Sequence, residues 1–191
     1  MNGTPSVDSP NDEVLMLAVE NGDARKLAVL FDRHHRVLFH FYLRLTGDRD
    51  ASEDLVQDVF FRMLKYRQTY RPGMDFATWM YRIARNARTD YFRKRSREVA
   101  LEEGWDAAGD ADAAPGRGLE ARQEAAMLRR ALAKLPEEKR EVLVLSRFQN
   151  LRYEQIGELL GCDVGAVKVR VYRALRELRE IYSQISGRKA S

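Results

Sequence analysis

Apolar residues recur at helical spacing along most of this sequence, and the alternating pattern of a half-buried strand is nearly absent. This pattern predicts an all-α protein, because each such segment can bury one apolar stripe as a helix. We expect Ser52 and Asp75 to act as N-caps and Pro136 to occupy a first helical position. The expected helices are 12–20, 24–46, 52–66, 75–97, 119–135, 136–148, 153–160 and 164–185.

A stretch rich in Gly, Ala and Asp, residues 104–118, interrupts this pattern. Such a composition is typical of a flexible linker. The 191 residues suffice for two small domains, each with a core of its own. We therefore predict a first domain at 13–98, an acidic linker at 99–118 and a second domain at 119–186. Short loose tails are expected at 1–12 and 187–191.

The charges are unevenly distributed, although 33 basic and 29 acidic residues leave a net charge of only +4. Residues 79–97 hold seven basic residues and one acidic residue, a net charge of +6. Residues 98–120 reverse this to −6, and residues 164–179 return to +4. Two basic blocks on predicted helices favour binding to nucleic acid or to another acidic partner.

Several classes of protein are excluded. The single cysteine, Cys162, rules out a disulfide framework and a thiolate-rich zinc site, and it suits a reducing cytosol. No apolar run reaches the roughly 20 residues that span a bilayer, and residues 1–10 do not resemble a secretory signal. We therefore expect a cytoplasmic protein without membrane insertion.

Enzymatic function has weak support. Glu53, Asp54 and Asp58 share a helix face, but no nucleophile or metal ligand lies near them in the sequence. The three histidines, His34, His35 and His40, lack the spacing of a zinc-protease motif. A hydrolase or nuclease is thus a minor alternative, and we expect no catalytic residue, metal, cofactor or small-molecule substrate.

Residues 153–167 have the pattern of a helix-turn-helix. Gly157 lies where two helices would cross closely, and Gly161 can adopt the positive φ that ends the first helix. Asp163 is placed to cap the second helix. The alternative is an ordinary helical hairpin with a solvated basic face, but the glycine spacing favours DNA binding.

The second of these helices has two distinct faces at 100° per residue. The predicted buried face comprises Val164, Val167, Val171, Ala174, Leu175 and Leu178. The predicted DNA-binding face comprises Gly165, Ala166, Val169, Tyr172, Arg173 and Arg176, with Lys168 and Arg170 on its flanks. Arg173 can reach guanine edges and Val169 a thymine methyl group, while Lys168, Arg170 and Arg176 suit phosphates.

The helix predicted at 52–66 also has two faces. Its apolar half comprises Leu55, Val56, Val59, Phe60, Met63 and Leu64. Its polar half comprises Asp54, Gln57, Asp58 and Lys65, and Phe61 lies among them. An exposed Phe61 ringed by carboxylates would suit docking on a basic partner. Alternatively, Phe61 packs under the neighbouring loop, and the spacing does not decide between these two arrangements.

The helix predicted at 75–97 combines aromatic and basic residues. Trp79, Ile83 and Ala87 form an apolar stripe, so some of its aromatic residues belong to the core. The rest suit single-stranded nucleic acid, because cations follow phosphates while aromatic rings stack on unpaired bases. The candidate contact residues are Trp79, Arg82, Asn86, Asp90, Arg93 and Lys94.

These motifs resemble the sigma-70 family of RNA polymerase sigma factors. Residues 54–60, 76–86 and 90–93 resemble region 2, and residues 135–142 with the helix-turn-helix resemble region 4. The spacing matches the extracytoplasmic-function (ECF) subfamily, whose members have only these two domains.

This resemblance implies a transcription-initiation factor that binds core RNA polymerase and promoter DNA. The face with Asp54, Gln57, Asp58, Phe61 and Lys65 would dock on the β′ clamp helices, and the β flap is a further implied contact. The loop 66–75 and the helix around Asn86 would hold a flipped base of the melted minus-10 element. The predicted recognition helix would read the minus-35 element, with Val169 where similar sequences often carry a small polar residue.

An anti-sigma factor as regulator is implied by the resemblance alone. The competing function is a stand-alone helix-turn-helix regulator, which would bind duplex DNA unaided, usually as a dimer at a palindrome.

Overall fold

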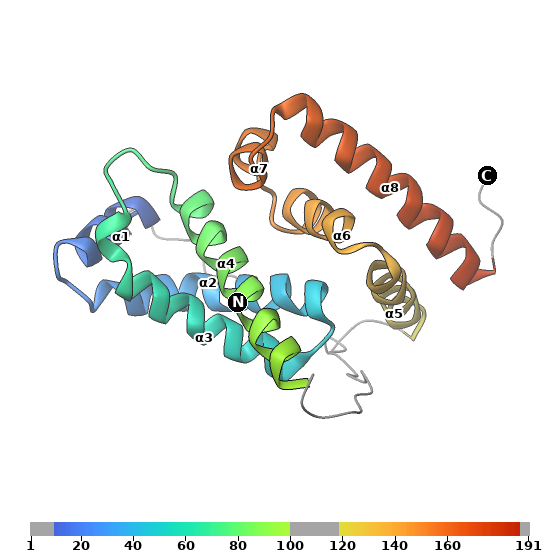
Figure 1. The fold of residues 1–191 in the computed structure, drawn as a ribbon, viewed down its shortest axis with the longest axis horizontal. Coiled ribbons are helices and arrows are strands. Elements are labelled where there is room, and N and C mark those ends of the chain that lie inside the picture. The colour runs from blue at the N-terminus through green and yellow to red at the C-terminus, as the bar shows by residue number, and fades with distance from the viewer. Residues whose placement is uncertain (1–9, 100–118, 188–191) are drawn as a thin grey trace.

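The computed structural model describes residues 10–99 and 119–187 (Figure 1). Within these ranges all regular secondary structure is helical, which confirms the predicted all-α class. Most of the expected tails and nearly all of the expected acidic linker lie outside the described residues, although Asp12 already begins the first helix and Val99 still belongs to the fourth. The boundaries proposed for them therefore stay predictions.

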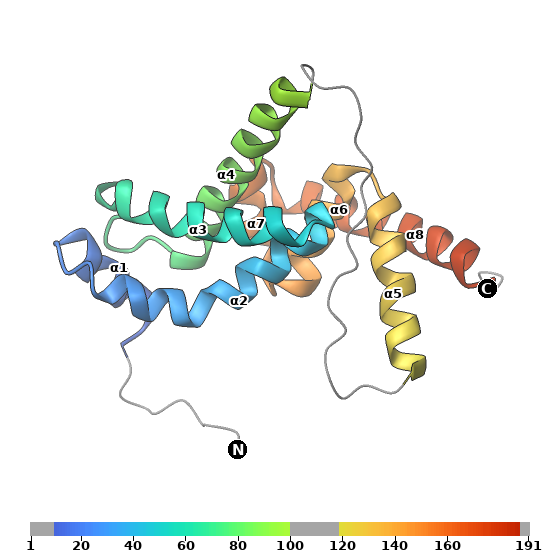
Figure 2. The same ribbon diagram turned by 90° about the horizontal axis from the view of Figure 1, so that it is seen from below.

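The first four helices form one group and the last four form another (Figures 1 and 2). The first group comprises α1 (Asp12–Glu20), α2 (Lys26–Thr46), α3 (Arg49–Lys65), a 3₁₀ turn (Arg67–Thr69) and α4 (Phe76–Val99). The second comprises α5 (Leu119–Lys134), α6 (Glu137–Leu143), a π-helical turn (Val144–Phe148), α7 (Tyr153–Leu160) and α8 (Val164–Ser186).

Three predicted helix starts have different outcomes. Asp75 caps α4 as predicted, because its Oδ1 accepts the Thr78 N–H at 2.7 Å. The prediction for Ser52 was wrong: Asp48 caps α3 by accepting the Ala51 N–H at 3.0 Å, and Ser52 is buried one turn further on. Pro136 is the N-cap of α6 and so precedes the first helical position by one residue.

The core of the first group lies between α2, α3 and α4. Phe41, Leu55, Met63 and Met80 are nearly inaccessible to solvent there, and full burial of such a side chain contributes about 1.5–3 kcal/mol. The Tyr42 hydroxyl donates to the carbonyl oxygen of Ala84 at 2.9 Å. This buried hydrogen bond fixes α2 against α4, the helix with most of the predicted single-strand contacts.

The helix-turn-helix has the predicted geometry. A Cβ on Gly157 would lie 2.6 Å from the carbonyl oxygen of Cys162, so only glycine fits. Gly161 ends α7 with a φ of 64°, and Asp163 caps α8 by accepting the Ala166 N–H at 2.9 Å. Ile156 of α7 is buried in the core that packs this turn against α8. The turn therefore sets the orientation of α8.

The two groups of helices pack against each other, with α4 facing α7 (Figure 1). The Tyr81 hydroxyl donates to the side-chain oxygen of Gln149 at 2.7 Å. The Arg44 guanidinium lies 4.4 Å from the centre of the Phe148 ring, a cation–π distance. The sequence did not predict this packing.

Candidate nucleic-acid and partner interfaces

The α8 helix presents the predicted reading face to solvent. Val169 and Tyr172 are 47% and 67% exposed, and Val167 and Val171 on the opposite side are buried. The remaining predicted contacts, Lys168, Arg170, Arg173 and Arg176, are exposed as well. Arg176 lies 3.8 Å from Glu180 one turn on, but both side chains are more than half exposed. Because exposed ion pairs contribute little free energy, Arg176 can exchange Glu180 for a phosphate group at little cost.

The α3 helix settles the open question about Phe61. Its ring is 65% exposed, so it does not pack under a loop, whereas Phe60 beside it is buried. Asp54, Gln57 and Lys65 are also exposed, and Asp58 is half-buried. The five predicted docking residues thus lie on an accessible side of α3, with an aromatic ring among polar groups.

Arg62 links this side of α3 to α4, a connection that the sequence analysis missed. Its guanidinium donates to Asp58 at 2.9 Å and to Asp90 at 2.7 Å. Partial burial alone would lower the pKa of Arg62, but these two carboxylates raise it. The hydrogen bond from Arg62 in turn lowers the pKa of Asp90. Asp90, a predicted DNA contact, is therefore held as a carboxylate against Arg62.

The six predicted single-strand contacts on α4 have different environments. Asn86, Arg93 and Lys94 are exposed, and Asp90 accepts a 2.7 Å hydrogen bond from Arg93. Trp79 is only 4% exposed, and its indole N–H donates to the Thr69 hydroxyl at 3.3 Å. Trp79 is therefore mainly a core residue. Only the edge of its side chain that lines a neighbouring cavity could contact DNA.

That cavity of about 330 Å³ lies at the start of α4. Its first-domain wall comprises Gly73, Met74, Asp75, Thr78, Trp79 and Arg82, and Glu158 of α7 completes it. Partial burial raises the pKa of Asp75, but hydrogen bonds from Thr78 and Gln155 outweigh it and the pKa is lowered. The cavity thus combines an aromatic edge, two carboxylates and a guanidinium, a set that could stack on a planar base and form hydrogen bonds with its edge.

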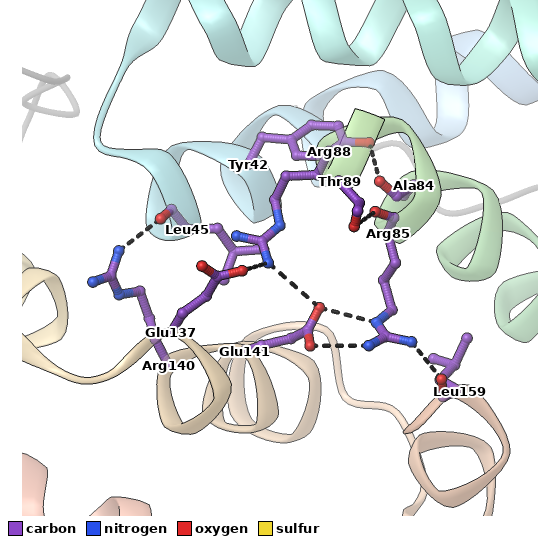
Figure 3. Close-up of polar contacts among 10 residues, drawn as sticks. All are labelled: Tyr42, Leu45, Ala84, Arg85, Arg88, Thr89, Glu137, Arg140, Glu141 and Leu159. Carbon is purple, nitrogen blue, oxygen red and sulfur yellow. Dashed lines mark hydrogen bonds and ion pairs between the residues drawn. The ribbon is translucent and has the colours of Figure 1, made fainter. Parts of the chain in front are cut away.

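Three arginines of α4 form ion pairs with glutamates of the second group, and Figure 3 shows two of them, Arg85 and Arg88. Arg82 pairs with Glu158 at 2.7 Å, and Arg85 contacts both carboxylate oxygens of Glu141 at 2.9 and 3.2 Å. Arg88 pairs with Glu137 and lies 4.0 Å from Glu141. We call Arg82, Arg85 and Arg88 the arginine row. The sequence places these three cations on one helix but does not indicate their partners.

Residues 10–99 and 119–187 contain no group of three or more His, Cys, Asp or Glu side chains that could hold a metal ion. None of the helices in these ranges has both the length and the apolar character needed to cross a bilayer.

Comparison with known proteins gives matches in both halves. Residues 30–98 match the family model for sigma-70 region 2, and residues 125–178 match that for sigma-70 region 4. The ECF RNA polymerase sigma factor SigE of Mycolicibacterium smegmatis is 32% identical over 188 residues, covering 95% of this chain and 73% of SigE. The ECF RNA polymerase sigma factor EcfG of Rhodopseudomonas palustris is 36% identical over 138 residues, covering 72% and 75%.

Among solved structures, the sigma factor RpoE from Bartonella quintana, in complex with the anti-sigma factor NepR, is similar. Its TM-score is 0.70 at 28% identity, and the match covers 81% of this chain and 94% of RpoE. The likeness therefore extends over most of both chains.

Proposed function

Because this chain belongs to the ECF RNA polymerase sigma factors of the sigma-70 family, we propose that it binds core RNA polymerase and directs it to a specific class of promoters. In this role it lends DNA specificity and strand opening to the polymerase and catalyses no reaction itself. Its place of action would be the cytoplasm, where polymerase and chromosome meet.

The exposed Phe61 is the observation that carries the proposal. At 65%, Phe61 is the most exposed phenylalanine of the described residues, and it lies among polar and charged side chains, as expected for an aromatic anchor that a partner covers. A stand-alone helix-turn-helix regulator could use an exposed aromatic for dimerisation, but the carboxylates of Asp54 and Asp58 beside Phe61 would repel their counterparts across a two-fold interface. A docking site for the β′ clamp helices explains this exposure, with Phe61 as the central anchor and Asp54, Gln57, Asp58 and Lys65 around it.

Promoter contacts are divided between the two halves. We assign minus-35 recognition to the exposed face of α8, with Arg173 and Val169 toward base edges and Lys168, Arg170 and Arg176 toward phosphates. The β flap would contact the same half. We assign the melted minus-10 strand to α4, where Asn86, Asp90, Arg93 and Lys94 are accessible. The cavity beside Trp79 and Arg82 would receive a flipped base.

We also propose control by an anti-sigma factor. The support is that the similar RpoE was solved in complex with the anti-sigma factor NepR. An anti-sigma protein for this chain should compete with core polymerase for it. A candidate that binds the chain without reducing its binding to core would contradict this part of the proposal.

A transcription assay tests the proposed function. A promoter is first selected from a randomised DNA library with polymerase reconstituted from core enzyme and this chain. We expect a run-off transcript from the selected promoter with core plus chain, and none with core alone. If no sequence is enriched and no core-dependent transcript appears, the proposed function is wrong.

A further inference from the structure

Four side chains of alternating charge connect the docking side of α3 with the predicted single-strand contacts of α4, the helix packed beside it (Figure 1). Arg62 donates from Nε to Asp58 at 2.9 Å and from Nη1 to Asp90 at 2.7 Å. Arg93 donates to the other carboxylate oxygen of Asp90, also at 2.7 Å. We call Asp58, Arg62, Asp90 and Arg93 the charge chain. Its first member belongs to the proposed polymerase-docking surface, and its last two belong to the proposed strand-binding surface.

Arg62 is the least exposed member of the charge chain. Its side chain is 21% exposed, against 36% for Asp58 and 65% for Arg93. A basic group of a partner can therefore reach Asp58, and a phosphate can reach Arg93, while neither of them touches Arg62. Arg62 lies between the two surfaces and is bonded to both.

The two carboxylates compete for this one guanidinium. A guanidinium that faces a carboxylate side-on donates to both of its oxygens. Arg62 does not bind Asp90 in this way, because its Nε is held by Asp58 and the second oxygen of Asp90 accepts from Arg93. If Asp58 is taken by another cation, Nε and Nη1 of Arg62 can both turn to Asp90. Arg62 then neutralises that carboxylate, and Arg93 is released.

The release of Arg93 changes what α4 presents to a DNA strand. While Arg93 is paired with Asp90, a phosphate must displace the carboxylate, and the like charges of the two groups repel each other. Once Arg62 has neutralised Asp90, both of these costs are smaller. One additional phosphate contact also makes single-strand binding more sensitive to salt, by about 0.7 in the slope of log K against log salt concentration.

We propose that Arg62 is a positioning residue that couples Asp58 to Arg93. When a basic group of a partner occupies Asp58, Arg62 moves to Asp90. Arg93 then becomes available to a phosphate of single-stranded DNA. The identity of the partner as the β′ clamp helices, and of the strand as the minus-10 element, rests on the proposed function. The charge chain itself rests on the three hydrogen bonds.

A charge-matched pair of full-length variants tests this coupling. Asp58→Asn imitates a carboxylate that a partner has already taken, because asparagine keeps the shape of the side chain and loses its charge. Asp54→Asn removes the same charge from an exposed carboxylate on the same helix. Asp54 lies eight residues before Arg62. That spacing is about 12 Å along the helix axis, beyond ion-pair distance.

Binding is measured by fluorescence anisotropy with a short labelled single-stranded DNA of random sequence, at several salt concentrations and without polymerase. We expect Asp58→Asn to bind this DNA at least about threefold more tightly than Asp54→Asn at low salt. Its salt dependence should be steeper by about 0.7, because Arg93 has become a phosphate contact. Equal affinity and equal salt dependence of the two variants overturn the proposal.

The same pair in an Arg62→Met background separates the proposed path from a direct effect of the Asp58 charge on DNA. Methionine keeps an unbranched stem but cannot pair with a carboxylate, so the two asparagine variants should then bind DNA equally. A difference that persists without Arg62 overturns the proposal. A purely structural role of Arg62 would lower the stability of both variants without removing the difference between them. If circular dichroism shows that Arg62→Met does not fold, Arg62→Gln replaces it.

These results are separable from those of the transcription assay. If wild-type holoenzyme transcribes the selected promoter but the two asparagine variants bind DNA alike, the coupling is wrong and the proposed function stands. If Asp58→Asn binds more tightly only when Arg62 is present, but no promoter-specific transcript appears, the coupling stands and the proposed function is wrong.

Discussion

Arg85 of α4 and Glu141 of α6 form a bidentate ion pair, although 56 residues separate them in the sequence. Glu141 is 7% exposed, and its carboxylate also lies 4.0 Å from the Arg88 guanidinium (Figure 3). One carboxylate thus neutralises two cations at the boundary between the two groups of helices. This relationship leads directly to a prediction about stability.

Glu141→Ala should lower the free energy of unfolding by about 1–3 kcal/mol, because it leaves the partly buried Arg85 guanidinium without a carboxylate and Arg88 with Glu137 alone. Glu158→Ala removes only an exposed partner of Arg82 and should cost less than about 1 kcal/mol. Urea titration followed by circular dichroism measures both. Equal losses from the two variants would show that burial at Glu141 does not strengthen its ion pairs.

Gly157→Ala should destabilise the helix-turn-helix by about 1–3 kcal/mol, because the new Cβ would lie 2.6 Å from the carbonyl oxygen of Cys162. Gly165→Ala is the comparison: its Cβ would meet only a side-chain oxygen of Asp163 at 2.9 Å, which can move aside at the cost of its cap hydrogen bond to Ala166. The higher helix propensity of alanine offsets part of that cost. We expect a clearly smaller loss for Gly165→Ala in thermal unfolding. If the two substitutions cost the same, the close approach at Gly157 does not constrain the turn.

Phe61→Ala should weaken binding to core polymerase by about 2–4 kcal/mol, as for a central anchor of an interface. Its effect on folding should stay within about 0.5 kcal/mol, because the ring is already exposed. Val14→Ala, a 53% exposed apolar residue on α1, serves as the control and should leave core binding unchanged. Competition of each variant with labelled wild-type chain for core gives the affinities. Normal competition by Phe61→Ala would place the docking surface elsewhere.

Arg173→Ala should weaken recognition of the minus-35 element by about 1–3 kcal/mol while binding to core polymerase is retained. The loss should depend on the base sequence, because the proposed contact is to a base edge. Lys168→Ala should instead weaken binding to all promoter sequences about equally, since its proposed contact is a phosphate. Binding of each holoenzyme to a panel of minus-35 variants compares them. A uniform loss with Arg173→Ala would make this residue a phosphate contact.

Local sequence patterns predicted the helices and the helix-turn-helix well. The buried face of α8 could be predicted from the helical spacing of its apolar residues, because Val167, Val171 and Ala174 lie on one side of any helix with that sequence. The start of α3 could not be predicted in this way, because Asp48 is as good a cap as Ser52. The tight turn at Gly47, with a φ of 72°, places Asp48 at the helix start. Competition between neighbouring caps is decided by the turn that precedes them.

The exposure of Phe61 and the ion pairs of the arginine row could not be predicted in the same way. Spacing placed Phe61 among polar residues but left open whether a loop covered it, which depends on the path of the chain after α3. The partners of Arg82, Arg85 and Arg88 lie 49–76 residues further along the chain. No local pattern connects residues so far apart, so only the packing of the two groups of helices brings them together.

The most direct test of the central claim compares footprints on the selected promoter with and without core polymerase. Potassium permanganate detects unpaired thymines at the minus-10 element, and nuclease protection reports binding at the minus-35 element. We predict that both signals appear with core plus chain, and that neither appears with the chain alone at the same concentration. Strong protection of a palindromic site by the chain alone, without permanganate-reactive thymines when core is added, would contradict the account and identify a stand-alone helix-turn-helix regulator.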